Sequence, residues 1–341
     1  TLDAGFHVSD YHREHALAMR PTLTSRLYDN AGYKQEQSAF GKVGYTTGDW
    51  RFAADVQLRR AAFQYHPSVG AGISPFGTDW TFLNPKLSVA YTVRPGVELF
   101  GSWGRTGREP ARADLFAGAD DIDVTTVGSV LPLTRVQPED LDDFEGGIRW
   151  RTARATLTAN LFDMEFRNEV LAIGTISLTG NPLRKNVDRS YRRGVELDGT
   201  WQLSDEWSTT ANLTVMTARI ASYRDDAAAK TYVNVAPIAT PPVLFNHRLQ
   251  YRASSSMSWD VGTRFQDRGQ LANDGNAAMV TPAFWMFDTG VSWRVGGVDW
   301  RGDIQNLGDV RAYGSGYEEN GGRSFFPLAG RSFLVTARIA F

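Results

Sequence analysis

The chain has 341 residues, of which 22% are charged, with a formal net charge of -2 and no cysteine. This balance excludes a disulfide framework and gives no basic excess for binding nucleic acid, so no nucleic-acid partner is expected. No stretch approaches the roughly 18 to 20 consecutive apolar residues of a membrane-spanning helix.

Strict alternation of apolar and polar residues dominates the chain. In "KLSVAYTV", Leu87, Val89, Tyr91 and Val93 share one face of an extended segment, and Lys86 begins the other. A period of two residues is typical of a β-strand and excludes a helix. The segments with this pattern are 86–93, 97–103, 144–150, 195–203, 287–295, 298–305 and 333–341.

The length of these segments indicates the solvent on each side. With their flanking residues they run about 9 to 13 residues, which suffices to cross a bilayer at a tilt of about 45°. The apolar face would contact acyl chains, and the polar face, including Arg338 of the final segment, would face a wet lumen. This predicts an all-β, antiparallel transmembrane β-barrel with Phe333 and Phe341 on its outer surface.

Short and long connections alternate along the chain, which is the pattern of short periplasmic turns and long outer loops in outer-membrane barrels. About 15 strand candidates result, the weakest lying before Ser38, and an odd number means either a miscount by one or missing strands. The predicted turns are 46–49, 94–96, 151–154, 203–206, 254–256 and 295–297, and the predicted long loops are about 60–80, 105–141, 167–188, 219–242, 267–282 and 308–328.

Several motifs occur in the order found in TonB-dependent outer-membrane receptors, and from about Phe40 to Phe341 the chain resembles the C-terminal part of this family. The stretches that carry the resemblance are "NPKLSVAYTV", "LFGSWGRTGREPARADLF", "DDFEGGIRW", "LTANLFDMEFRNEV", "NVDRSYRRGVELDGTW", "IQNLGDVRAYGSGY" and "LAGRSFLVTARIAF". A terminal aromatic residue such as Phe341 is also typical of these barrels.

The resemblance implies a barrel of about 22 strands with an N-terminal plug in its lumen. Residues 1–341 would then be one partial barrel domain, without the plug and the first strands. It also implies a monomer in the outer membrane of a Gram-negative bacterium, surrounded by lipid. The protein would take up a scarce metal chelate, most often a ferric siderophore, with coupling to TonB through the plug. Cobalamin, haem, copper or an oligosaccharide remain open as ligands, and neither a cofactor nor an enzymatic activity is expected.

The predicted loop 105–141 is the first candidate for ligand binding. Arg105, Arg108 and Arg112 could hold an anionic ligand, since planar guanidinium groups suit carboxylate and phosphate, and Phe116 adds an aromatic contact. Alternatively, "REPARADLF" is a structural loop in which Arg108 pairs with Glu109 or Asp114. Two further candidate ligand contacts, Tyr65 and His66, lie at the base of the preceding long loop.

No metal site is predicted. Asp120, Asp121 and Asp123 could offer carboxylate oxygens to Ca²⁺, but no EF-hand loop surrounds them and solvated charge is the alternative. His12 and His15 are three residues apart, which places them on opposite faces of a strand. His247 falls on the lipid-facing phase and is interpreted as structural.

The inward acidic and basic residues are interpreted as a hydrated charge network or a surface for the plug, because no nucleophile or paired acid and base accompanies them. These residues are Glu196, Asp198, Asp288, Asp299, Arg301 and Asp303. Two other classes remain open. A passive porin of about 14 to 16 strands would fit the length, but no inward-folded constriction loop is evident in the sequence. An adhesin or structural barrel would have loops without a binding pocket.

Overall fold

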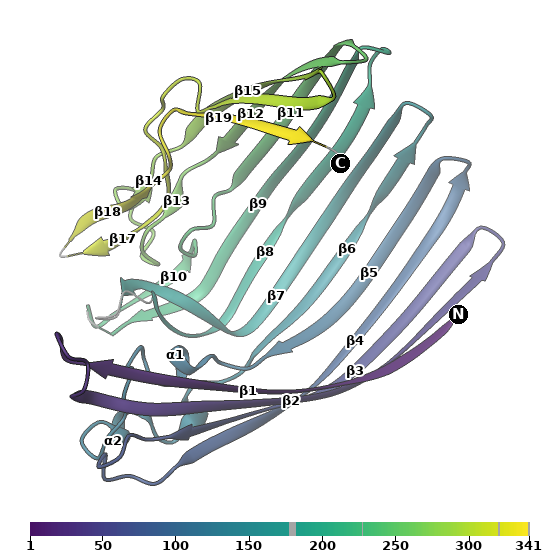
Figure 1. Cartoon of the computed structure of the whole chain (residues 1–341). Coiled ribbons are helices and arrows are strands. Elements are labelled where there is room, and N and C mark those ends of the chain that lie inside the picture. The colour runs from purple at the N-terminus through teal and green to yellow at the C-terminus, as the bar shows by residue number, and fades with distance from the viewer. Residues whose placement is uncertain (177–181, 227, 320, 340–341) are drawn as a thin grey trace. The chain divides into compact units, whose positions relative to one another are not determined.

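A computed structural model describes residues 1–176, 182–226, 228–319 and 321–339, and β-strands dominate it (Figure 1). The strands are β1 (Leu2–Ala18), β2 (Arg26–Thr47), β3 (Trp50–His66), β4 (Phe76–Arg94), β5 (Val97–Arg108), β6 (Glu139–Arg151), β7 (Ala155–Ile176), β8 (Pro182–Gln202), β9 (Trp207–Asp225), β10 (Lys230–Val235), β11 (Val243–Ser254), β12 (Met257–Gln266), β13 (Gly269–Gln270), β14 (Val280–Thr281), β15 (Phe284–Val295), β16 (Val298–Gln305), β17 (Tyr313–Glu319), β18 (Gly322–Pro327) and β19 (Ser332–Ile339). The short helices are α1 (Arg112–Leu115), α2 (Val127–Val130) and the 3₁₀ turn η1 (Leu133–Arg135). None of the helices in the described part of the chain has both the length and the apolar content to cross a bilayer.

In the described part of the chain fifteen strands share one sheet, one of which lies outside the row of strands that the sequence predicted. Fourteen follow one another as hydrogen-bonded neighbours in the order β1-β2-β3-β4-β5-β6-β7-β8-β9-β11-β12-β15-β16-β19. The fifteenth, β10, pairs with β9 and lies inside a long connection. The row of fourteen strands, here called the wall, therefore holds an even number among the described residues, and the predicted count of about 15 is too high by one. β13–β14 and β17–β18 form separate two-stranded sheets in two further connections.

The chain divides into two compact units. Unit 1 comprises Thr1–Val89, Ser102–Asp143 and Met164–Ser190, and unit 2 comprises Ala90–Gly101, Phe144–Asp163 and Tyr191–Phe341.

Unit 1 begins with three antiparallel strands, whose register is continuous except for a shift between Leu17 and Ala18. β1 pairs with β2 from Leu2 opposite Val43, and β2 pairs with β3 up to Thr47 opposite Trp50. The β2–β3 connection is a tight turn, whereas β3–β4 and β5–β6 are joined by long connections at the opposite strand ends (Figure 1).

Unit 2 repeats this arrangement. The β11–β12 and β15–β16 turns lie at the strand ends opposite those that carry β13, β14, β17 and β18 (Figure 1). Gly296 and Gly297 connect β15 to β16 with φ of 60° and 79°. Both values lie in the left-handed region that a two-residue type I′ hairpin requires, which is why a Gly-Gly pair stands there. All six turns predicted from the sequence separate strands where expected.

The strands are longer than predicted. β2 and β7 each have 22 residues, and the predicted loop at 60–80 is strand except for the stretch 67–75 between β3 and β4. Interstrand hydrogen bonds join backbone groups whatever the side chains are, so a ladder can continue past the alternating segment that the sequence pattern reports. Period two therefore locates the part of a strand with one apolar and one polar face, and not the end of the strand.

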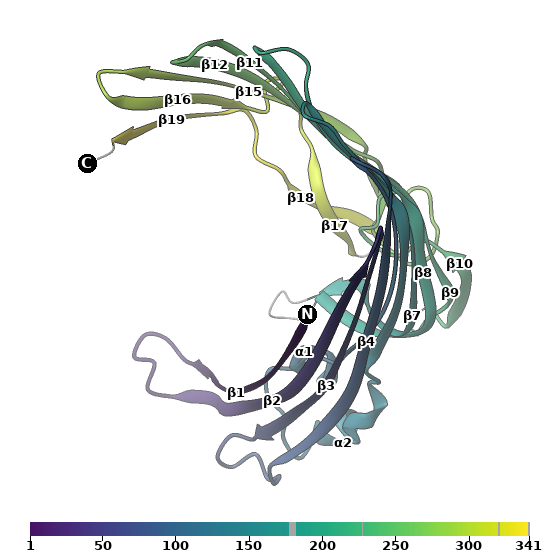
Figure 2. The same ribbon diagram turned by 90° about the vertical axis from the view of Figure 1, so that its right-hand side faces the viewer.

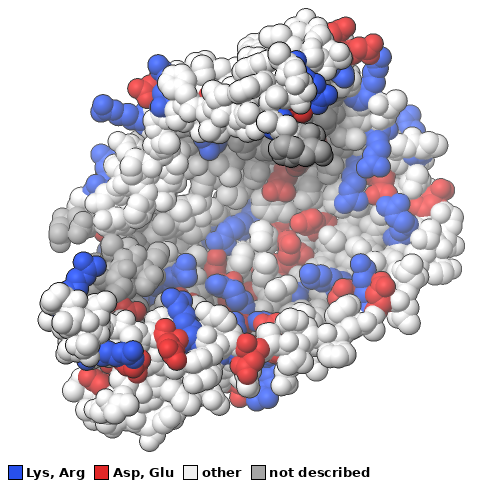
Figure 3. Space-filling model, in the orientation of Figure 1, with Lys and Arg blue, Asp and Glu red and all other residues white. Residues whose placement is uncertain are grey.

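The two faces of the strands differ as the alternation predicts. In the β16–β19 pair, Ile304 lies opposite Phe333 on one face, and Asp299 lies opposite Arg338 on the other. The side chain of Phe333 is 72% exposed, and Phe341 lies outside the described residues. Figure 3 shows basic and acidic side chains next to one another on the visible face of the strands.

The outward apolar side chains are not part of a buried core. Leu197 is 37% exposed, Trp150 37% and Trp201 54%. A row of large apolar groups left in water would be a strong liability for aggregation, whereas acyl chains solvate it. In unit 1, the buried apolar cluster lies where the long β5–β6 connection packs on β3.

Candidate functional site

The β5–β6 connection, residues 109–138, folds back onto the polar face of the strands in unit 1. Phe116 is 1% exposed and packs edge-on against Tyr65 of β3, with ring centroids 5.0 Å apart. Phe63 of β3, with Leu115, Ile122, Val130 and Leu133 of the connection, completes the cluster. Figures 1 and 2 both show α1 beside β1 and β2. The sequence analysis found no inward-folded loop, and this packing corrects that view.

Glu109 fixes the start of the connection to the wall. Its carboxylate accepts two hydrogen bonds from the guanidinium of Arg59 on β3, at 2.7 and 2.9 Å, and one contact from Lys34 on β2 at 2.5 Å. Arg59 also donates to Glu36 at 2.9 Å. Burial by itself would raise the pKa of Glu109, but the hydrogen bonds from Arg59 and Lys34 outweigh it and lower the pKa to about 2.

A second anchor holds the middle of the connection. One carboxylate oxygen of Asp121 accepts hydrogen bonds from Asn30 at 2.9 Å, from Tyr65 at 3.1 Å and from Ser68 at 3.0 Å. The hydroxyl of Tyr65 in turn accepts the backbone N–H of Ile122 at 3.0 Å. Since Tyr65 is fully buried, these bonds leave its polar atom satisfied inside an apolar cluster.

Arg112, the first residue of α1, lies between the connection and the wall. Its Nη2 donates to Asn30 Oδ1 at 2.9 Å and to the carbonyl of Asp120 at 2.6 Å. The guanidinium carbon lies 5.5 Å from the ring centroid of Tyr65 and 5.3 Å from that of Phe116, which are cation–π distances. Its Nε is buried and has no hydrogen-bond partner among the residues that the structure describes.

These elements enclose a cavity of about 400 Å³ in unit 1, a size that suits a small-molecule ligand. Charged side chains from β1, β2 and the connection lie next to aromatic ones in its lining. The residues concerned are Tyr11, Arg13, His15, Lys34, Phe63, Trp80, Glu109, Arg112 and Asp120.

Three of the six candidate ligand residues come together here, namely Tyr65, Arg112 and Phe116. Arg112 lines the cavity itself, and the other two pack behind it. His66 does not join them, because alternation along β3 turns it to the opposite face from Tyr65. There it packs against Tyr33, with centroids 4.6 Å apart.

Arg105 and Arg108 are engaged in ion pairs away from the cavity. Arg105 donates to both oxygens of Asp142 at 2.9 and 2.7 Å. Arg108 donates to both oxygens of Glu139 at 3.2 and 2.9 Å. The prediction that Arg108 pairs with Glu109 or Asp114 is wrong, because the fold brings the start of β6 next to the end of β5. The role of Arg105 and Arg108 as ligand contacts stays a prediction.

The other polar candidates have structural surroundings. Asp123 accepts from the backbone N–H groups of Thr125 and Thr126 in a local turn, and no group of metal-binding side chains is found among the described residues. His12 stacks on Tyr33 at 4.5 Å, whereas His15 lines the cavity, so the two lie on opposite faces as predicted. The imidazole of His247 is 2.8 Å from the hydroxyl of Thr209.

Part of the predicted inward charge network exists in unit 2. Arg301 donates to Asp260 at 2.9 Å and contacts Asp303 at 2.7 Å, and Arg294 bonds Asp299. The sequence analysis missed Asp260, which is 5% exposed and central to the network.

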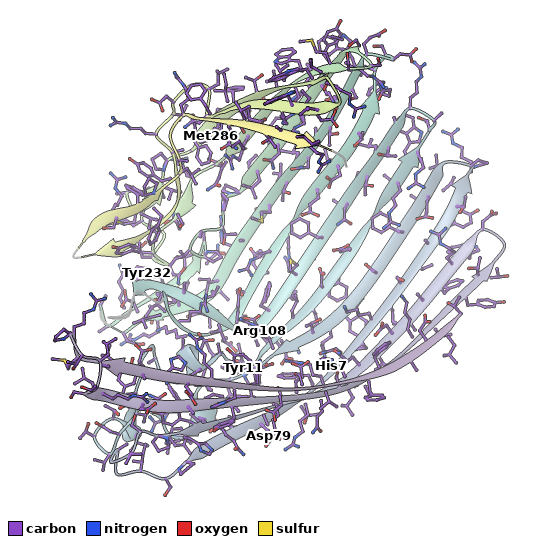
Figure 4. All side chains as sticks on the ribbon, viewed as in Figure 1. His7, Tyr11, Asp79, Arg108, Tyr232 and Met286 are labelled. Carbon is purple, nitrogen blue, oxygen red and sulfur yellow. The ribbon has the colours of Figure 1, made fainter. Side chains whose placement is uncertain are left out.

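A second cavity, of about 550 Å³, lies on the same unit and is lined by Arg248, Arg264 and Met286 among others. Figure 4 marks Met286 on β15 in unit 2 and, in unit 1, Tyr11 on β1.

Sequence reasoning also missed Arg13, Lys34, Arg59 and Glu109 as parts of the site. Arg59 and Lys34 alternate regularly with outward residues, so period two could have placed both on the inward face. Nothing in the local pattern of "GREPARAD" separates a buried glutamate from a solvated one.

Comparisons with known proteins agree with this architecture. A family model described as "TonB dependent receptor-like, beta-barrel" matches residues 2–307. No curated protein sequence matches the chain.

Several solved structures share the fold at low sequence identity. They include the siderophore receptor PiuA from Acinetobacter baumannii (17% identity, TM-score 0.67, covering 92% of this chain and 44% of that one). The ferric yersiniabactin uptake receptor FyuA from Yersinia pestis is similar at 17% identity and TM-score 0.70, covering 100% and 51%. The ferric citrate transporter FecA in its unliganded form is similar at 15% identity and TM-score 0.75, covering 98% and 50%.

The chain thus spans about half the length of these solved structures. The family match extends over 2–307, well over half of the chain, and includes the whole cavity of unit 1. The antiparallel strand order and the two-faced strands are those that a membrane β-barrel needs. The chain belongs to the TonB-dependent receptor-like β-barrel family.

Proposed function

We propose that the protein is an outer-membrane receptor of a Gram-negative bacterium that takes up a scarce metal chelate, with a ferric siderophore as the favoured ligand. The observation that carries this proposal is the two-faced wall of a family member. Its outward apolar side chains are exposed on strands long enough to cross a bilayer, and its inward face is polar. The cavity under the β5–β6 connection supplies a place for a small molecule.

The relatives support the choice of ligand class. PiuA is a siderophore receptor, FyuA takes up ferric yersiniabactin and FecA transports ferric citrate. At identities of 15% to 17% these names describe a class and not a particular chelate. We further propose that the protein acts as a monomer without catalytic chemistry, and that TonB energises uptake through a plug in the complete polypeptide.

The test is uptake of radioactive iron by cells that produce the complete protein and lack other receptors for the chelate supplied. We expect the protein in the outer-membrane fraction, and we expect uptake that disappears when TonB is deleted. Uptake that is equal with and without the protein, for every chelate class supplied, would contradict the proposal.

A passive porin is the second candidate, because residues 109–138 pack on the inward face as a constriction loop would. The two functions differ in selectivity and energy dependence. Liposomes that contain a porin swell in solutions of small sugars without TonB, whereas a gated receptor leaves them unchanged.

A further inference from the structure

Among the described residues, the lining of the cavity in unit 1 holds more positive than negative charge. Arg13 and His15 on β1, Lys34 on β2 and Arg112 of α1 line it, with Glu109 and Asp120 as the acidic residues. The carboxylate of Glu109 is already shared between Lys34 and a guanidinium outside the lining. Lys34 is therefore compensated, and two charged groups of the lining, Arg13 and Arg112, remain for the carboxylate of Asp120.

The hydrogen bonds of Arg112 do not supply the missing negative charge. Its hydrogen-bond acceptors are the amide oxygen of Asn30 and the backbone carbonyl of Asp120, which are both neutral. Burial lowers the pKa of Arg112, and the nearby charge of Arg13 adds to that lowering. A partly buried guanidinium beside a second one is stabilised when an anion binds to both.

Both arginines have donor groups without a partner among the described residues. One of these groups is the Nε of Arg112, which is buried. Arg13 makes no hydrogen bond or ion pair with any of the residues that the structure describes. Tyr11 and Trp80 line the same cavity and offer aromatic surface beside these donors.

We propose that this cavity binds an anionic ligand, with its carboxylate or phenolate oxygens held by Arg13 and Arg112 and its apolar part packed on Tyr11 and Trp80. The proposal rests on the proposed function and narrows it, because it selects negatively charged chelates over neutral ones. The positive charge of the two arginines draws anions from solution.

The experiment is a calorimetric titration of the intact protein in detergent with three iron complexes. Ferric citrate and the ferric complex of 2,3-dihydroxybenzoate are anionic, and ferric tris(acetohydroxamate) is neutral. We expect the anionic complexes to bind at least about tenfold more tightly than the neutral one, and increasing salt to weaken only the anionic ones.

The decisive variant is Arg13→Gln, which removes a charge that makes no hydrogen bond or ion pair with the described residues. We expect it to weaken binding of the anionic complexes by about tenfold and to leave the neutral complex unaffected. Arg264→Gln is the matched control, since Arg264 lines the cavity of unit 2 and the substitution removes the same charge. Arg112→Gln should weaken anion binding further, but it also removes the contacts with Asn30 and Asp120.

The possible results separate the two proposals. Equal effects of Arg13→Gln and Arg264→Gln, or tighter binding of the neutral complex, would overturn the anion site and leave the uptake function standing. Titration with citrate and 2,3-dihydroxybenzoate without iron tests the anion site separately from iron-chelate uptake. If these anions bind in a manner sensitive to Arg13→Gln while no iron complex binds, the site is supported and iron-chelate uptake is not. No binding of any anion would overturn the site.

Discussion

Removal of the Glu109 carboxylate should release the start of the β5–β6 connection from the wall. In Glu109→Gln the two guanidinium hydrogen bonds and the Lys34 contact lose their charge. A pKa lowered from 4.5 to about 2 corresponds to at most about 3 kcal/mol. The Lys34 side chain is 45% exposed, so screening by solvent reduces the expected loss to about 2 kcal/mol.

Hydrogen exchange of the backbone measures this loss locally. We expect amides of residues 109–136 to exchange about 30-fold faster in Glu109→Gln, because about 2 kcal/mol less is needed to open the connection. Asp79→Asn is the control, since the Arg60–Asp79 pair is more than half exposed on both sides and contributes little.

The stabilisation that Glu109 gives to the β5–β6 connection depends on pH with a definite sign. The pKa of Glu109 is lowered in the folded protein, so its stabilisation is fully present above pH 4.5 and is lost as the pH falls towards 2. Wild-type protection of the connection, corrected for intrinsic exchange, should decrease in this window and that of Glu109→Gln should not. The reasoning fails if Glu109→Gln exchanges as slowly as Asp79→Asn, or if both proteins respond equally to acid.

Three further substitutions test the faces and anchors. Leu197→Arg places a charge on the outward face and should lower the free energy of unfolding in vesicles by about 2 to 4 kcal/mol, measured by urea unfolding. Asp198→Asn on the inward face is its control and should change that free energy little. Equal effects would contradict the assignment of faces. Tyr65→Phe leaves the backbone N–H of Ile122 without its acceptor and should accelerate local exchange there by about 5- to 100-fold, and an unchanged rate would show that the connection is held elsewhere. Asp260→Asn weakens the bonds with Arg301 and should lower the free energy of unfolding by about 1 to 3 kcal/mol; no change in the urea midpoint would mean that water replaces the pair.

The sequence alone determined the faces of the strands, the turns between them and the family, but not the full length of the strands. Leu197 and Trp201 alternate with Asp198 and Thr200, and that period is a local property of the backbone. Gly296 and Gly297 likewise mark their turn by their own conformational freedom. These signals need no knowledge of distant residues.

The tertiary structure decided which charges meet. Glu109 bonds Arg59 across 50 residues of chain, and its partner depends on how the connection folds onto β3. The register that places Ser38 opposite Arg59 brings Glu36 and Lys34 into the same cluster. Side-chain alternation assigns each residue to a face, but a pairing also requires the interstrand register and the path of the loop, which depend on long-range packing.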